Sequence, residues 1–227
     1  AFKAFNTDAE KRAYLDLIQD VSTRRSLNLT NFRRVKLNTK AESHIWDVEN
    51  FSFTYAYSEA TRTNFNLTEN TQRNIRGGVA WQYNSTFKGF EPFKESKWAE
   101  KKSLQFIRDF NINPMPASIS VRGDLDRSFN KIIYRNASAD AASSLPNFQK
   151  YFVFNRNYAV KWNLTRALGL DYTARVTAII DEPDGDINTD SLKQIVKDNL
   201  RKLGRAKNFE QTITANYVVP FDKVDRK

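Results

Sequence analysis

Residues 50–58 read NFSFTYAYS, and this stretch decides the fold class. The aromatic residues Phe51, Phe53, Tyr55 and Tyr57 alternate with small residues, most of them polar. Successive side chains of a β-strand point to opposite sides of a sheet. The alternation therefore predicts a strand with one aromatic face and one face of small, mostly polar residues.

The same two-residue period recurs along the chain and predicts an all-β fold. We expect about six or seven long strands, at residues 27–37, 49–58, 74–84, 117–129, 150–164, 167–181 and 207–219. Two or three short helices are expected in loops, at residues 8–21, 190–203 and 96–109. Short connections alternate with long ones, which is typical of an antiparallel up-and-down meander.

The composition excludes several classes of function. The chain has 227 residues, no Cys and one His, His44, which rules out disulfide scaffolds and Cys-zinc sites and disfavours His-based triads. No run of 18 apolar residues is present, so no transmembrane helix is expected. Gly and Pro total 7 + 6 = 13 residues, about half the usual share, which suits long strands with few tight turns. The net charge of +10 fits a polar lumen, exposed loops or contacts with lipid phosphates.

The aromatic faces allow two interpretations, a soluble or periplasmic all-β binding domain with an aromatic core or a piece of a membrane barrel. Three features favour the barrel: the length of the strands, the hydrophilic residues opposite the aromatic face, and Trp and Tyr near the strand ends. Seven strands are too few to enclose so many charges, and open edges are costly in lipid. Residues 1–11 contain no apolar signal core, which leaves a cytoplasmic chain or a fragment of a larger protein, and we expect the fragment.

The alternation assigns residues to two faces. The expected lipid-facing residues are aromatic or aliphatic: Phe51, Phe53, Tyr55, Tyr57, Val79, Trp81, Tyr83, Ile119, Val121, Leu125, Tyr158, Val160, Trp162, Leu164, Leu170, Tyr172, Ile213 and Tyr217. The expected lumen-facing residues are polar: Ser52, Thr54, Arg122, Asp124, Asp126, Asn157, Lys161, Asp171, Thr173, Arg175, Glu210 and Thr212.

Other candidate sites have simpler explanations. Asp181, Asp184 and Asp186 are a weak calcium candidate, because their spacing does not match the EF-hand pattern and a solvated loop explains them. Asp124 and Asp126 lie on one predicted face beside Arg122, so charge pairing is favoured over acid–base catalysis. The basic clusters lack an RNA-binding signature, and no nucleic-acid partner is expected. We expect no metal, no cofactor and no enzymatic activity.

Long aromatic-rich motifs carry a resemblance to a known family. They are HIWDVENFSFTYAYSE (44–59), FEPFKESKW (90–98), FIRDFNINPMPASISVRGDLDRSF (106–129), FNRNYAVKWNLTRALGLDYTA (154–174), IDEPDG (180–185) and NYVVP (216–220). In this order they resemble the SprA (Sov) family, the outer-membrane translocon of the Bacteroidetes type 9 secretion system. The resemblance covers most of the chain from residue 28 to residue 220.

This resemblance implies a very large transmembrane β-barrel through which folded proteins cross the outer membrane. In gliding bacteria the family exports adhesins to the cell surface. The implied partners are the remainder of the same barrel, a PorV-type barrel at a lateral gate, a plug protein, secreted cargo proteins and outer-membrane lipid. We therefore expect residues 1–227 to be a wall segment of such a barrel, acting as a passive conduit without bond chemistry.

Overall fold

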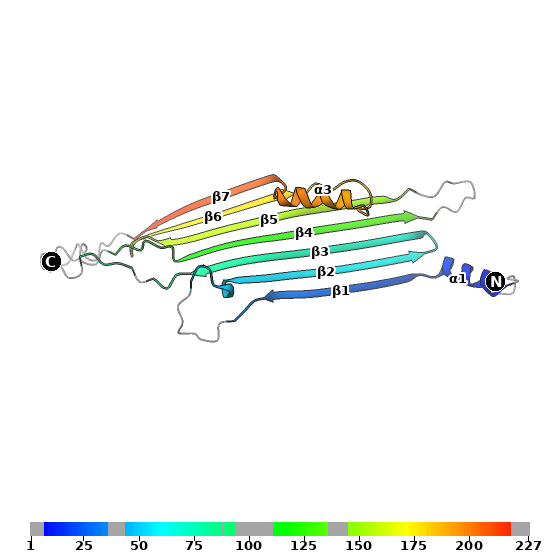
Figure 1. Ribbon diagram of the computed structural model, residues 1–227, viewed down its shortest axis with the longest axis horizontal. Coiled ribbons are helices and arrows are strands. Elements are labelled where there is room, and N and C mark those ends of the chain that lie inside the picture. Colours follow the sequence, from blue (N-terminus) through cyan, green and yellow to red (C-terminus); the bar gives the residue numbers. More distant parts are fainter. Residues whose placement is uncertain (1–6, 36–43, 88, 94–110, 136–144, 219–227) are drawn as a thin grey trace.

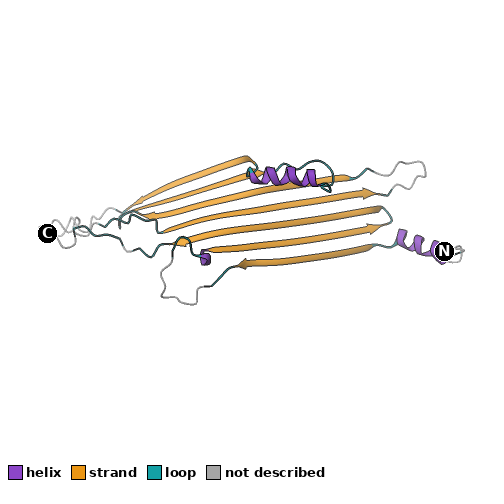
Figure 2. Cartoon of the chain, viewed as in Figure 1, coloured by secondary structure: helices purple, strands orange, loops and turns teal. Residues whose placement is uncertain are grey.

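The computed structural model describes residues 7–35, 44–87, 89–93, 111–135 and 145–218 (Figure 1). Seven strands make up most of this part of the chain, and helices are few (Figure 2). The strands are β1 (Val21–Phe32), β2 (Phe51–Asn64), β3 (Leu67–Asn84), β4 (Ser118–Tyr134), β5 (Asn147–Asn163), β6 (Leu168–Ile179) and β7 (Arg205–Tyr217). The helices are α1 (Asp8–Ile18), the short 3-10 helix η2 (Val48–Asn50) and α3 (Asp190–Arg201).

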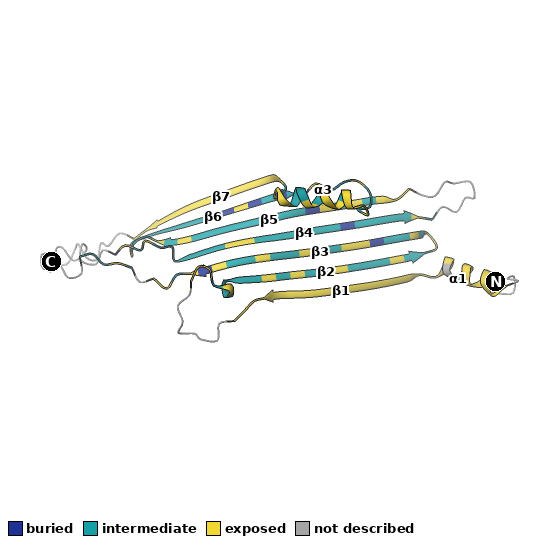
Figure 3. Ribbon diagram, viewed as in Figure 1, coloured by how far each residue is buried: buried dark blue, intermediate teal, exposed yellow. Residues whose placement is uncertain are grey.

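The strands form one antiparallel sheet whose spatial order is the chain order, β1 to β7. Each strand pairs only with its neighbours in the sequence, so the predicted up-and-down meander is confirmed. The sheet is not closed: β1 and β7 are its two edges, and both strands are exposed along their whole length (Figure 3). With 18 residues in β3 and 17 in β4, these two strands are about three times as long as usual.

The strand registers sort the side chains into two faces. One cross-strand row runs from Phe53 through Val79, Gly123 and Arg156 to Val176. Most neighbouring rows on this side are aromatic or aliphatic, and we call it the apolar face. The side that carries Ser52, Thr54 and their cross-strand neighbours is called the polar face.

A β-bulge keeps β1 in phase with this division. Leu29 pairs with Tyr55, but the next apolar-face pair is Phe32 with Phe53, so one extra residue lies on β1. Asn31 takes up the bulge with φ 52°, a left-handed conformation that Asn tolerates better than most residues. Without the extra residue, Phe32 would point to the polar face.

Helix α3 and the segment before it lie against one end of the apolar face (Figure 1). Thr189 caps the helix by accepting a hydrogen bond from the Leu192 N–H. Near this end Phe129, Phe152 and Ile180 are buried. Among the described residues no second sheet or further helix covers the rest of this face.

Several predicted boundaries are wrong by a few residues. The first strand occupies Val21–Phe32, not 27–37, and the first helix ends at Ile18. The strands β2 to β4 run further than predicted, to Asn64, from Leu67 and to Tyr134. The sequence did not indicate these extensions, because the alternation of apolar and polar residues is lost there. Leu164 follows the end of β5 and belongs to the turn. The helix predicted at 96–109 lies outside the described residues.

Two glycines of the apolar face are expected to respond in opposite directions to substitution. A Cβ at Gly123 would lie 3.1 Å from the Phe154 ring, whereas a Cβ at Gly77 would have no neighbour within 4 Å. Gly123→Ala should therefore destabilise the fold by about 1–3 kcal/mol through overpacking. Gly77→Ala should stabilise it by roughly 0.4–1 kcal/mol through the unfolded state. Urea titration of both variants checks this, and equal effects would contradict it.

Candidate functional site

The apolar face gathers 17 of the 18 residues expected to face lipid. The ladders place them in shared rows; for example, Tyr83, Ile119, Val160, Tyr172 and Ile213 form one row. Leu164 is the exception, since it lies in the turn after β5, where its carbonyl accepts a hydrogen bond from the Asn113 N–H. All twelve residues expected to face the lumen lie on the polar face.

The apolar face is open to its surroundings over much of its area. Phe53 keeps 45% of its surface exposed, Tyr217 62% and Ile213 72%. Monomeric soluble proteins rarely expose contiguous apolar patches larger than a few hundred Å². An exposed apolar face that extends over seven strands is typical of a surface that contacts another protein or a membrane.

The apolar residues form a band of limited height. On β5 the band runs from Phe152 to Trp162, which is about 34 Å along the strand at ~3.4 Å per residue. A strand tilted by ~40° would place this length over about 26 Å of the membrane normal, close to the ~25 Å apolar band of outer-membrane barrels. Lys150 and Glu59 lie beyond the band, so the strands are longer than the band itself.

Tryptophans lie at the end of the band that is remote from α3. The Trp162 indole N–H donates to the Asn113 carbonyl at 2.7 Å, and the Trp81 N–H donates to the Ile45 carbonyl at 3.2 Å. The Trp81 and Tyr83 rings stack with centroids 6.5 Å apart. Apolar rings with a hydrogen-bonded polar tip are typical of residues at a membrane–water boundary.

Arg156 is a charged exception within the band. It lies in the row of Phe53 and Val79, and its guanidinium carbon is 5.4 Å from the centroid of the Phe154 ring. Its Nε is buried without a hydrogen-bond partner among the described residues. The sequence alternation gave no role to this position, because its two neighbours Asn155 and Asn157 are already polar.

The polar face is crossed by lateral hydrogen bonds and ion pairs. Arg122 holds Asp124 with two bonds, of 2.7 and 2.9 Å, and Arg76 lies 3.4 Å from Asp126. The expected charge pairing around these two aspartates is therefore present. Further along, Thr177 donates to Asn155 at 2.9 Å. Polar side chains that pair with one another in this way suit a surface in contact with water.

Charged side chains occupy the apolar side beyond the band. Arg73 donates to Glu59 at 2.7 Å, and Lys131 lies between Glu69 at 2.9 Å and Asp186 at 3.4 Å. The sheet therefore changes from apolar to ionic along its strands, on the same side. On the polar face at the corner of β1 and β2, Arg62 hydrogen-bonds to Asp20 and thereby holds the pKa of that carboxyl below its ordinary value.

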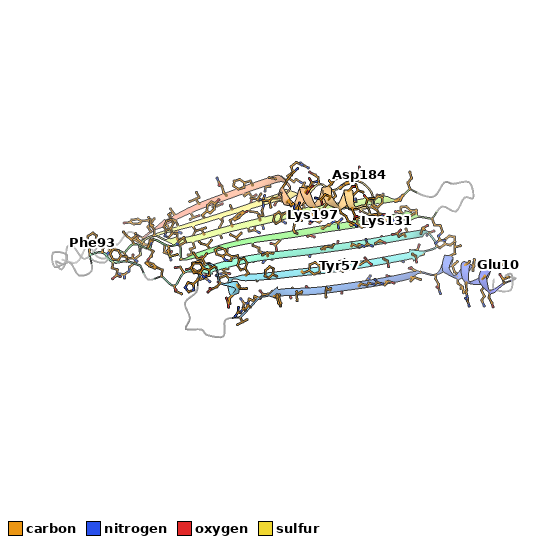
Figure 4. All side chains as sticks on the ribbon, viewed as in Figure 1. Glu10, Tyr57, Phe93, Lys131, Asp184 and Lys197 are labelled. Atoms are coloured by element: carbon orange, nitrogen blue, oxygen red, sulfur yellow. The ribbon has the colours of Figure 1, made fainter. Side chains whose placement is uncertain are left out.

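The three carboxylates of the calcium candidate do not converge. Asp181 pairs with Arg205 at 3.2 Å and Asp186 with Lys131, while Asp184 is exposed (Figure 4). Within the described residues no group of three or more His, Asp or Glu side chains is placed to hold a metal ion. His44 stacks on Trp46 with centroids 5.1 Å apart, in the turn that leads to η2.

Comparison with known proteins gives no family assignment. No protein-family model matches the chain, and no curated protein matches it. In the part of the chain that the structure describes, no helix has the length and apolar character needed to cross a membrane. The candidate functional site is therefore defined by the geometry of the apolar and polar faces of the sheet.

Sequence reasoning missed the ionic end of the sheet and the contribution of β1. Leu27 and Leu29 pair with Tyr57 and Tyr55 and extend the apolar face by one strand. Their alternation with Ser26 and Asn28 was visible, but the charged residues Arg24 and Arg25 interrupt it on both sides of the strand. The sequence therefore predicted this strand only from residue 27 onward, and the pairing with β2 shows that it begins at Val21.

Proposed function

We propose that this chain forms part of the wall of a large transmembrane β-barrel, with its apolar face toward lipid and its polar face toward a water-filled lumen. The observation that carries the proposal is the uncovered apolar face of a single-layered sheet, about as tall as the apolar band of a membrane barrel. The open edges support it as well, because further strands of a barrel would satisfy their backbone groups.

Together with the sequence resemblance to the SprA (Sov) family, this geometry supports a translocon wall in the outer membrane, acting in type 9 secretion and gliding motility. In this proposal the wall excludes lipid and offers cargo proteins a polar lining without bond chemistry. The polar face suits that role because its charges are paired with one another, as Arg122 is with Asp124. Partners such as a PorV-type barrel and a plug protein follow from the resemblance alone.

Single cysteines test which phase each face meets, and the absence of native Cys makes the labelling unambiguous. In this test, nitroxide labels are attached to the full chain in phospholipid vesicles. Labels on the apolar face replace Phe53, Val79 and Val121, and labels on the polar face replace Thr54, Ala80 and Ser120. Collision with dissolved oxygen should dominate for the first set, and collision with a water-soluble nickel complex should dominate for the second. The alternation should follow each strand residue by residue.

If the nickel complex reaches the labels on the apolar face as readily as those on the polar face, the proposal of a barrel wall is wrong. Labels at Arg24 and Arg25, which lie beyond the band, serve as controls because both should report water. A soluble binding domain predicts another pattern, in which the chain stays monomeric in plain buffer and the labels at Phe53 and Val79 are immobilised in a closed core.

A further inference from the structure

A pocket of about 400 Å³ lies between α3 and the sheet, at the ionic end of the apolar face. Its cationic lining comes from Arg73, Arg127 and Lys193, and its apolar lining includes Ile75, Phe129 and Val196. Asp186 is the one carboxylate among the described residues that line it, and Lys131 pairs with it at 3.4 Å. Figure 4 shows Lys131 at this end of the sheet beside the helix.

The segment that forms the roof of the pocket is fastened to the sheet by three cations. Arg127 pairs with Glu182 at 2.5 Å, and this carboxylate is only 4% exposed. Lys150 donates to the carbonyl oxygens of Pro183 and Gly185. With the Lys131–Asp186 pair, these contacts hold residues 182–186 on β4 and β5, so the pocket is a built feature of the fold.

Each of the two arginines of the pocket is held in place by a hydrogen bond from its own Nε. The Nε of Arg73 donates to Glu59, and the Nε of Arg127 donates to Glu182. Their guanidinium carbons lie 6.0 and 5.9 Å from the centroids of the Phe129 and Phe152 rings. Among the described residues, the terminal Nη groups of both arginines make no hydrogen bond. Two guanidinium groups that are held in place and keep free N–H groups can donate hydrogen bonds to the oxygens of a phosphate.

The pocket adjoins the apolar band directly. Ile75 belongs both to the band and to the pocket lining, and Arg73 lies two residues further along β3 on the same face. In a membrane wall this position is the level of the lipid headgroups. A ligand there can place an acyl chain along the aromatic rows and an anionic group among the cations.

We propose that the α3 pocket binds the phosphate group of an anionic membrane lipid. This inference rests on the proposed membrane wall. Arg73 and Lys193 bind the phosphate oxygens, Arg127 contributes its outer Nη group, and the apolar lining accepts the start of an acyl chain. The α3 helix closes the site from the outside, and Lys197 on the same helix does not line it (Figure 4).

The test measures lipid binding to the detergent-solubilised full chain by native mass spectrometry. Phosphatidylglycerol is the probe, and phosphatidylcholine and inorganic phosphate are the comparison ligands. Wild type should retain phosphatidylglycerol over phosphatidylcholine. Arg73→Lys keeps the positive charge and the partner Glu59 but loses the planar guanidinium group. This change should weaken the binding of phosphatidylglycerol roughly tenfold. Lys193→Gln should weaken it by a smaller factor.

Matched controls lie close to each substituted residue. Arg76→Lys changes the same residue type on the opposite face of β3, and Lys197→Gln removes a charge one turn further along α3; both should bind like wild type. If Arg73→Lys and Arg76→Lys weaken the binding of phosphatidylglycerol equally, the proposed lipid site in the α3 pocket is wrong.

Flotation with pure phosphatidylcholine vesicles separates the proposed lipid site from the proposed membrane wall. A chain that floats without preferring phosphatidylglycerol refutes only the lipid site. Arg73-dependent binding of inorganic phosphate by a chain that does not float refutes both the lipid ligand and the wall.

Discussion

Phe53→Arg is expected to lower the free energy of unfolding in phospholipid vesicles by about 2–4 kcal/mol. Phe53 lies in the middle of the apolar band, 45% exposed, with Phe32 and Val79 beside it. A guanidinium on the lipid face near the bilayer midplane carries a cost of that size. Urea titration of the full chain in vesicles, followed by tryptophan fluorescence, measures the change.

The neighbouring residue provides the control for this substitution. Thr54→Arg introduces the same charge on the polar face, in the row of Gly78 and Asp124, where water and a carboxylate are near. It should change stability by less than about 0.5 kcal/mol. If the two variants lose the same stability in vesicles, the apolar face does not meet lipid.

A pair of proline substitutions in β1 is expected to be severely disruptive at both positions. Neighbouring residues of a strand direct their N–H groups to opposite sides within the sheet plane, and proline has none. If β1 pairs with β2 and with a further barrel strand, Ser26→Pro and Leu27→Pro each leave a carbonyl without its donor. In lipid an unsatisfied backbone group costs several kcal/mol. In a barrel assembled from this chain and further strands, the folded yield in vesicles should therefore collapse for both variants.

The alternative outcome is equally definite. If β1 remains an open edge, one of its two N–H directions has no partner, and one of the two variants should fold like wild type. That result would refute the continuation of the wall beyond β1. The equivalent pair Ser22→Pro and Thr23→Pro lies outside the apolar band and should be less costly, since water can satisfy the exposed groups.

The face assignment was predictable because it depends only on the period of two that the pleat imposes. Phe51 to Tyr57 and Tyr158 to Trp162 follow that period without interruption, so their placement required no knowledge of the pairing. The β5–β6 pairing was predictable from its short connection, and the up-and-down order from the alternation of short and long connections. The all-β meander therefore followed from local pattern alone.

Features that depend on pairing between strands were not predictable. Residues 127–134 continue β4, yet Arg127 and Lys131 stand on the side that is apolar earlier in the strand. Their partners Glu182 and Asp186 are 55 residues away in the chain, and no local pattern links them. The pocket beneath α3 arises from these contacts, which is why composition indicated only an unexplained excess of positive charge.

The identity of chain order and strand order has a consequence for how the sheet is built. Every ladder joins strands that are neighbours in the sequence, so each new pairing closes only the one connection between its two strands. The longest of these connections, residues 85–117 between β3 and β4, adds little to the entropic cost, because that cost grows slowly with loop length. The β2–β3 hairpin, joined by Phe65 and Asn66, is a natural starting point. Strands can then be added one at a time on either side. At every stage of this growth the product already has one apolar and one polar face, because each added strand continues the same alternation.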